Sequence, residues 1–214
     1  PFAPVAGTPV VFKASRLNYT ASTFDSTNNK IVISYKDYNN SNYGTAIVGT
    51  VSGSSISFGS PVVFQSSTVE NNVPVFDSSN NKMVVVYREA SNGKAIVGTV
   101  SGTSISFGTA VNFLSGVPYY PTATFDSNLN KIVISFTDTT NNNYGTGIVG
   151  TVSGTSISFG TATVFWSGYA EYNALTFDSN SNKVVFTYTS SAGYANVGTV
   201  SGTSISFGSE ATFN

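Results

Sequence analysis

The chain has 214 residues, a formal net charge of −1 and a charged fraction of only 9%. Its nine basic residues are scattered, so no basic surface suits a nucleic-acid backbone, and no apolar run approaches the roughly 20 residues that span a bilayer. Because cysteine and histidine are absent, disulfides and thiolate or imidazole metal sites are excluded. We therefore expect no nucleic-acid partner, no membrane insertion, no metal and no cofactor.

The first predicted element is a short strand within residues 1–12, whose core is Pro9, Val10, Val11 and Phe12. The same pattern recurs at four later places: 60–64, 109–113, 161–165 and, more loosely, 209–213. The strand pattern thus occurs five times although there are only four repeats, so the N-terminal copy is one more than the repeats require. We predict that it latches beside the last strand to close a ring, or that it adds to a sheet edge of a neighbouring molecule. A longer chain with further repeats is the third alternative.

Four tandem units of about 50 residues make up the rest of the chain. Each unit carries Phe-Asp-Ser, then Asn-Lys before an apolar run, then Gly-Thr-Val-Ser-Gly, and finally Ile-Ser-Phe-Gly. The anchors begin at Phe24, Phe76, Phe125 and Phe177. We treat residues 1–214 as one repeat domain with units at about 8–59, 60–108, 109–160 and 161–208, followed by a closing strand at 209–214.

The third unit illustrates the predicted strands. Alternating and β-branched runs predict strands at 122–126, 131–137, 147–152 and 157–165. The breaks between them are rich in Asp, Asn, Ser and Gly, which favour tight turns. Each unit is therefore expected to be a four-stranded antiparallel sheet.

The middle strands are apolar at consecutive positions, as in Met83 to Tyr87. Such strands are covered on both faces, which an isolated sheet does not provide. Sheets packed face to face around an axis do provide it. We therefore predict an all-β fold, a four-bladed β-propeller with an extra N-terminal strand.

An aspartate and a lysine recur in every unit, as in Asp25 and Lys30. An aspartate repeated in this way is expected to accept backbone N–H bonds in an Asx-type turn. The alternative is a calcium site in the Asp-Ser-x-Asn-Asn turn, but calcium takes 6 to 8 oxygen ligands and each turn supplies one carboxylate. We favour the turn role.

The segments that differ most between units directly precede each Phe-Asp-Ser strand, so the fold is expected to bring them to one face. They contain many aromatic and amide side chains, which suit carbohydrate or protein recognition, although the rings would also suit packing between units. The candidate ligand-binding residues are Arg16, Asn18, Tyr19, Glu70, Asn71, Tyr119, Tyr120, Trp166, Tyr169, Glu171 and Tyr172.

An enzymatic interpretation has little to rest on. Nucleophilic catalysis lacks a histidine base, and the sequence offers no phosphate-binding loop. Glu70 and Glu171 fall in equivalent loops and are the one conceivable carboxylate pair for glycoside hydrolysis. We expect them to be solvated loop charges, and the protein not to be an enzyme.

The repeat as a whole, F-D-S-x-x-N-K followed by G-T-A-I-V-G-T-V-S-G-T-S-I-S-F-G, resembles the tandem β-propeller-like repeats of predicted proteins from marine bacteria and their phages, including tail-fibre-like proteins. The resemblance covers residues 8 to 214. It implies a surface-exposed or virion-associated role in recognition or as a scaffold.

Low charge, abundant Asn and Thr, and a start at Pro1 instead of Met favour an extracellular, cell-surface or virion location. Our first hypothesis is a module that recognises a glycan or a surface receptor through the divergent loops. The alternative is a structural subunit of an extracellular filament or fibre, joined to further copies of itself through the N-terminal strand.

Overall fold

The computed structural model describes residues 7–213, and over this range the protein is all-β, with antiparallel, curled sheets and no helix. Unit 1 (residues 8–59) holds β1 (Leu17–Asp25), β2 (Lys30–Asp37), β3 (Tyr43–Ser52) and β4 (Ser55–Phe58). Unit 2 (60–108) holds β5 (Val62–Asp77), β6 (Lys82–Glu89), β7 (Asn92–Ser101) and β8 (Ser104–Phe107). Unit 3 (109–160) holds β9 (Val111–Leu114), β10 (Pro118–Asp126), β11 (Lys131–Asp138), β12 (Tyr144–Ser153) and β13 (Ser156–Phe159). Unit 4 (161–208) holds β14 (Thr163–Tyr169), β15 (Glu171–Asp178), β16 (Lys183–Thr189), β17 (Gly193–Ser201) and β18 (Ser204–Phe207), and β19 (Ala211–Phe213) follows it.

The same pairing is repeated from unit to unit. In unit 3, β10, β11, β12 and β13 pair in chain order, all antiparallel. The start of each following unit then returns to the sheet of the unit before it: β5 pairs with β3, β9 with β7, β14 with β12, and β19 with β17. Because β5 is continuous, it joins the sheets of units 1 and 2 into one nine-stranded sheet.

The single strand expected at 157–165 is wrong. The chain breaks at Gly160 into β13 and β14, and both pair with β12. At Gly160 the backbone passes so close to the Thr203 carbonyl oxygen of unit 4 that a Cβ atom would lie 1.9 Å from it, and β14 then begins at Thr163. Each unit therefore contributes four strands and pairs with a fifth from the segment that follows, and β5 takes part in the pairing of both units 1 and 2.

The repeated aspartates act as predicted, in the turns between the first two long strands of each unit. Asp25 Oδ1 accepts the backbone N–H groups of Thr27 (3.1 Å) and Asn28 (2.9 Å). Asp77, Asp126 and Asp178 accept the corresponding bonds in their own turns. In three units the repeated lysine donates to a threonine on the third strand at 2.9 Å, as Lys131 does to Thr151. These repeated residues are structural.

The hydrophobic core lies between units. Val32 and Val48 of unit 1 share one buried cluster with Val85 and Tyr87 of unit 2. Equivalent clusters fill the junctions between units 2 and 3 and between units 3 and 4. Each internal sheet is therefore buried on both faces, which explains why its middle strands are apolar at consecutive positions.

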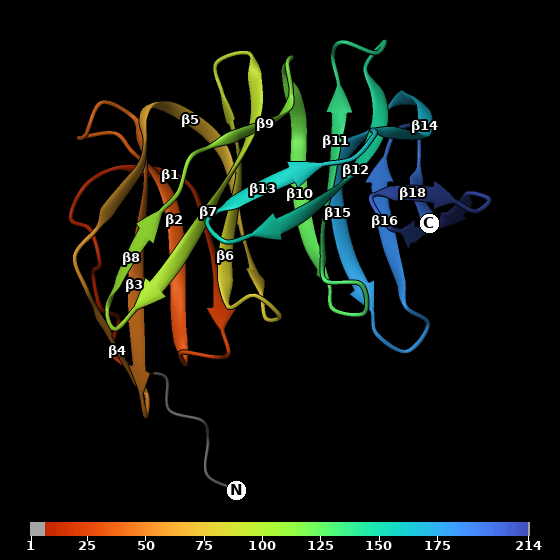
Figure 1. Ribbon diagram of the computed structural model, residues 1–214. Helices are drawn as coiled ribbons and strands as arrows, with labels where there is room; N and C mark the ends of the chain where they lie inside the picture. Colours follow the sequence, from red (N-terminus) through yellow and green to blue (C-terminus); the bar gives the residue numbers. More distant parts are fainter. Residues whose placement is uncertain (1–6, 214) are drawn as a thin grey trace, which may run out of the picture.

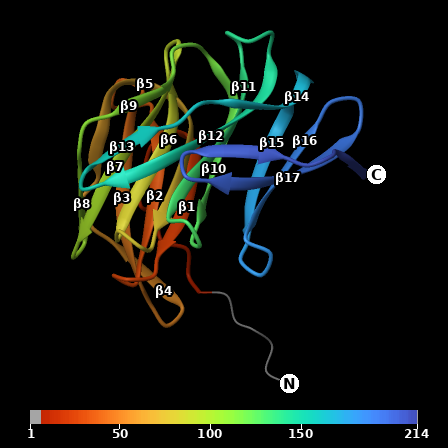
Figure 2. The same cartoon turned by 45° about the vertical axis from the view of Figure 1, so that its right-hand side comes forward.

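The units follow one another in a row. Figure 1 shows unit 1 in red and orange at one end and unit 4 in blue at the other, and the turned view of Figure 2 shows the same order. Among residues 7–213 the two end faces are uncovered: Val51 of unit 1 is 52% exposed and Val197 of unit 4 is 45% exposed. The four units of this chain are thus an open array, with an outward face at each end.

The N-terminal segment packs on unit 1 of its own chain. Phe12 lies with its ring centroid 5.6 Å from that of Tyr35 and 5.5 Å from that of Phe58, while Pro9, Val10 and Val11 are exposed. Residues 7–12 form no strand, and the last strand, β19, pairs only with β17 among the described residues. The latch prediction is therefore wrong for residues 7–12, and residues 1–6 of the predicted strand lie outside the described range.

No helix long and apolar enough to cross a membrane is found between residues 7 and 213.

Candidate functional site

Each unit contains a β-bulge at the same place, early in the strand that leads to Phe-Asp-Ser. The register between the paired strands shifts there in all four units. The bulge residue has a left-handed backbone in every case: Tyr19 (φ 51°), Asn71 (φ 54°), Tyr120 (φ 48°) and Tyr172 (φ 50°). The divergent segments chosen from the sequence are therefore four versions of one bulge.

A tyrosine in the left-handed region is unusual. Asparagine tolerates this conformation and glycine prefers it, whereas a bulky side chain is disfavoured there by on the order of 1–2 kcal/mol. Three of the four bulges nevertheless carry a tyrosine. Bulges re-aim side chains beside binding sites, and retained backbone strain is a feature of functional sites. The bulges are therefore where we locate the candidate site.

In units 3 and 4 the structure brings four predicted tyrosines together. Tyr119 and Tyr120 each lie within 6.5 Å of Tyr169 between ring centroids, and Tyr120 lies 5.0 Å from Tyr172. The Asn173 side-chain amide also donates to the backbone carbonyl of Tyr120 (3.3 Å), which ties the two bulges together. Tyr119 and Tyr169 are 39% exposed and Tyr172 is 69% exposed, so the cluster presents its rings to solvent.

In unit 1 the predicted residues gather around Tyr38. The Arg16 guanidinium lies 4.4 Å from the centre of the Tyr38 ring, and the Asn18 amide donates to its hydroxyl (3.1 Å). The ammonium group of Lys36 lies 5.4 Å from the same ring and 5.8 Å from the ring of Tyr19. Contacts of this kind between cations and aromatic faces are favourable and orient the rings.

Unit 2 connects the two groups through an ion pair. Glu70 binds Arg88 at 3.1 Å, and the Arg88 guanidinium lies 6.0 Å from the ring of Tyr119 in unit 3. Burial raises the pKa of Tyr19 in unit 1, and the negative charge of Glu70 raises it further. Side chains of unit 2 line a hollow of about 150 Å³ beside the pair: Ser67, Thr68, Glu70, Arg88, Glu89 and Ala90.

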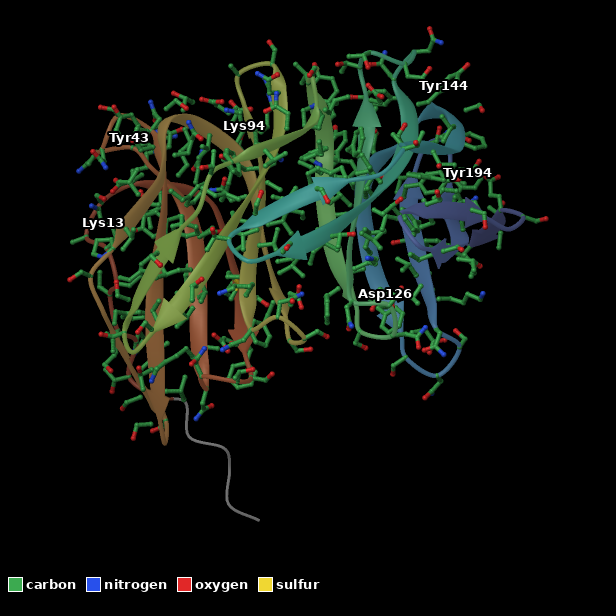
Figure 3. The ribbon with its side chains drawn as sticks, viewed as in Figure 1. Lys13, Tyr43, Lys94, Asp126, Tyr144 and Tyr194 are labelled. Carbon is green, nitrogen blue, oxygen red and sulfur yellow. The ribbon has the colours of Figure 1, made fainter. Side chains whose placement is uncertain are left out.

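These groups occupy equivalent bulges of the four units, and we call them together the bulge row. Its members are Arg16, Asn18, Tyr19, Lys36, Tyr38, Glu70, Asn71, Arg88, Tyr119, Tyr120, Tyr169, Glu171 and Tyr172. The row lies at the edge of the array where the hairpins β2–β3 and β11–β12 turn. Figure 3 shows this edge, marked by Tyr43 and Tyr144, at the top, whereas Asp126 marks the opposite edge with the aspartate turns.

Three residues of the row were not predicted as site residues: Tyr38, which directly follows β2, and the cations Lys36 and Arg88. The two cations belong to the second long strand of their units and pair with bulge residues: Asn18 pairs with Lys36, and Glu70 with Arg88. Counting outward from the tight Asp-Lys hairpin identifies this neighbourhood from sequence alone. The bulge shifts the strand pairing by one residue, so only the structure shows which residues are paired there.

Trp166 is the one predicted ligand-binding residue that lies apart from the row. Its ring stacks on Tyr194 at a centroid distance of 5.5 Å and an interplanar angle of 21°. Its indole Nε1 is buried without a hydrogen-bond partner among the described residues. Trp166 therefore packs between units 3 and 4, as the packing alternative for the aromatic residues anticipated.

The carboxylates are dispersed. Glu70 is engaged with Arg88, while Glu171 belongs to unit 4, with unit 3 between the two glutamates. Within residues 7–213 no group of three or more acidic side chains is placed to hold a metal ion. The arrangement presents aromatic faces, amides and two bulge-facing cations along a shallow surface.

The chain matches no protein-family model and no curated protein sequence.

Proposed function

We propose that this protein is a non-catalytic recognition module that binds an extended glycan along the bulge row. The observation that carries the proposal is the tyrosine at three of four bulges, held in a backbone conformation that this residue disfavours. A purely structural bulge needs only asparagine, as Asn71 shows in unit 2. The tyrosines are retained for what their rings contact.

A glycan fits the chemistry of the row. Sugar rings present flat C–H faces and many hydroxyls, so they bind to exposed aromatic rings flanked by directional hydrogen-bonding groups. The row supplies the rings of Tyr119, Tyr169 and Tyr172 with the amide of Asn18 and the guanidinium of Arg88. Because these groups follow one another over four units, a chain of several sugars suits them better than a single sugar. A surface receptor protein is the other partner class for such a surface.

We assign no catalytic role to the row. Its two glutamates lie in units that unit 3 separates, and Glu70 is paired with Arg88, so they do not form the close carboxylate pair that glycoside hydrolysis needs. The low charge of the chain and its resemblance to surface repeats support a place outside the cell or on a virion.

We also propose that the units serve as the blades of a β-propeller-type array. Four-stranded antiparallel sheets packed face to face around shared cores support this assignment. Small-angle scattering of the monomer tests whether this array is open or closed. We expect the elongated particle of an open row, whereas a compact, disc-like particle would mean that units 1 and 4 meet in solution.

A glycan array followed by titration calorimetry tests the binding proposal. We expect Tyr119→Ala and Tyr172→Ala each to weaken binding of the array hit about tenfold or more, without loss of the folded circular dichroism spectrum. Leu129→Ala is the matched control, since Leu129 is 38% exposed, close to the 39% of Tyr119, but lies in the aspartate turn at the opposite edge. Equal affinities for all three variants, or no hit on the array, would overturn the glycan proposal; binding of a protein instead would identify the receptor alternative.

A further inference from the structure

The outward face of unit 4 carries residues of the same kind as those buried at the internal junctions. Its exposed or half-buried residues are Val185, Thr187, Ala195 and Val197. The equivalent residues of unit 2 are Val84, Val86, Ala95 and Val97, and all four have no exposed surface because unit 3 covers them. Val197 is 45% exposed, whereas Val97 is fully buried. Unit 4 therefore presents the same surface that a following unit covers at each internal junction.

The outward face of unit 1 has the complementary character. Val51 is 52% exposed, whereas its equivalents Val100, Val152 and Val200 are only 6–7% exposed because the preceding unit covers them. Phe24 is also 50% exposed on unit 1. The two ends of the array thus carry the two halves of one repeated interface.

A close backbone contact marks each internal junction. A Cβ atom on Gly59, Gly108 or Gly160 would lie only 1.9–2.0 Å from the carbonyl oxygen of a threonine in the next unit, so only glycine fits there. At Gly208, the equivalent position after unit 4, the nearest atom is 3.7 Å away and belongs to Val197 of the same unit. Gly208 thus keeps the glycine of the internal junctions, but no neighbour occupies that contact among residues 7–213.

The C-terminal segment 208–213 is equivalent to the N-terminal segment 7–12, which already packs on unit 1. Phe64, Phe113 and Phe165 are 7–8% exposed because each packs on an aromatic side chain of its own unit, whereas Phe213 is 51% exposed. On unit 1 the corresponding site is filled by Phe12, which contacts Tyr35 as Phe64 contacts Tyr87. A Cβ on Gly7 would also lie 2.0 Å from the Ser54 carbonyl oxygen, which repeats the glycine contact.

We propose that two copies of this chain associate head to tail: the face of unit 4 in one copy docks on unit 1 of another, and Gly208–Phe213 displaces Gly7–Phe12 from its site. The new junction repeats the three internal ones in residue type and in its glycine contact. The N-terminal segment then restrains assembly, because it occupies the receiving site.

In this proposal the N-terminal segment restrains assembly, whereas the sequence-based alternative had that segment join one copy to the next. The interface is also separate from the bulge row, which is proposed to bind a glycan. A head-to-tail interface closes into a ring when the rotation per copy permits and otherwise grows into a filament. Either product has the same junction.

Light scattering coupled to size-exclusion chromatography tests the proposal over a concentration series, with the 22.4 kDa monomer as the reference mass. We expect Phe12→Ala to shift association to at least tenfold lower concentration than the wild type. Combined with Phe12→Ala, both Val197→Asp and Gly208→Ala are expected to restore the monomer. Ser204→Asp is the matched control, since the equivalents of Ser204 are exposed in every unit, and it should leave association unchanged.

Association that persists with Val197→Asp or Gly208→Ala would overturn the proposal, as would a monomer for both the wild type and Phe12→Ala at every concentration. Should Phe12→Ala fail to fold, cysteine pairing decides, because the chain has no cysteine of its own. Mixed Val51→Cys and Val197→Cys proteins should form a heterodimer on oxidation, whereas Val51→Cys with Ser204→Cys should not. Equal cross-linking in both mixtures would reject the interface.

Discussion

At the scale of single residues, the bulge tyrosines show how one position serves two demands. The bulge needs a left-handed residue, and Asn71 meets this need without strain. Tyr19, Tyr120 and Tyr172 meet it at an energetic cost, which fits a site selected for its rings.

We predict that Tyr172→Asn raises the free energy of unfolding by about 0.5–1 kcal/mol, because asparagine tolerates the left-handed backbone. Little packing is lost, since Tyr172 is 69% exposed. Urea denaturation measures the change, and glycan affinity should fall in the same variant. A stability loss above about 1 kcal/mol would mean that the tyrosine is needed for the fold instead.

The buried tyrosines of the junctions allow a second prediction at this scale. Tyr87 donates its hydroxyl to the Gln65 side chain (2.8 Å), whereas the Tyr35 hydroxyl is buried with no partner among the described residues. Tyr87→Phe should therefore cost about 1 kcal/mol, and Tyr35→Phe should be neutral or stabilising, as the natural Phe136 of unit 3 indicates. Equal losses for both variants would contradict this distinction.

The same residue predicts a pH dependence. Burial, followed by the nearby charge of Asp37, raises the pKa of Tyr35 to about 12 from the ordinary value of 10.0. The folded state therefore holds this proton more tightly than the unfolded state, so its contribution to stability is complete below pH 10 and is lost between pH 10 and about 12. Tyr35→Phe should make the decline over this range shallower; an unchanged pH profile would show that Tyr35 ionises freely.

At the scale of elements, the leading strand of each unit is what connects the array. It pairs with the sheet of the unit before it and packs its phenylalanine on its own unit, as β9 does with Phe113. The glycine before it fits against the next turn, so the junction is specified by hydrogen bonds, an aromatic contact and a backbone contact together.

Gly108 and Gly208 form a natural pair for testing this junction. A Cβ on Gly108 would lie 2.0 Å from the Thr155 carbonyl oxygen, so Gly108→Ala should lower the free energy of unfolding by about 1–3 kcal/mol. Gly208→Ala has open space and should change the stability of the monomer by less than about 0.5 kcal/mol. Similar urea midpoints for the two variants would show that the internal junction yields easily.

The elements also show what the sequence was able to predict. The aspartate turns and the two-sided burial of the middle strands depend on local residue chemistry, so the repeated motif predicted both. The pairing of each leading strand with the previous sheet, and the separate strands β13 and β14, depend on contacts between units that no local pattern encodes.

The candidate site was predicted in part for the same reason. The divergent segments identified the bulges, because variation on a shared scaffold is visible in the repeats themselves. The left-handed backbone and the partners Lys36 and Arg88 could not be predicted, because they depend on the register shift at the bulge. The packing of Trp166 on Tyr194 could not be predicted either, because it depends on how strands distant in sequence come together.

At the scale of the whole molecule, the hydrophobic cores lie at the junctions between units. This placement explains why the two end faces are exposed and why equivalent bulges line up along one edge. Because every junction uses the same faces, equivalent bulges come to the same edge. The end faces remain uncovered within residues 7–213, which is the basis for the head-to-tail association proposed above.

We propose that ligand recognition involves the bulge row of several units at once. The most direct measurement is a chemical-shift map of the isotopically labelled protein titrated with the longest oligosaccharide hit. We predict shift changes at bulge residues of at least two adjacent units, such as Tyr119 and Tyr172, with none in the turn at Asp126. Changes confined to one unit, or centred on the aspartate turns at the opposite edge, would contradict it.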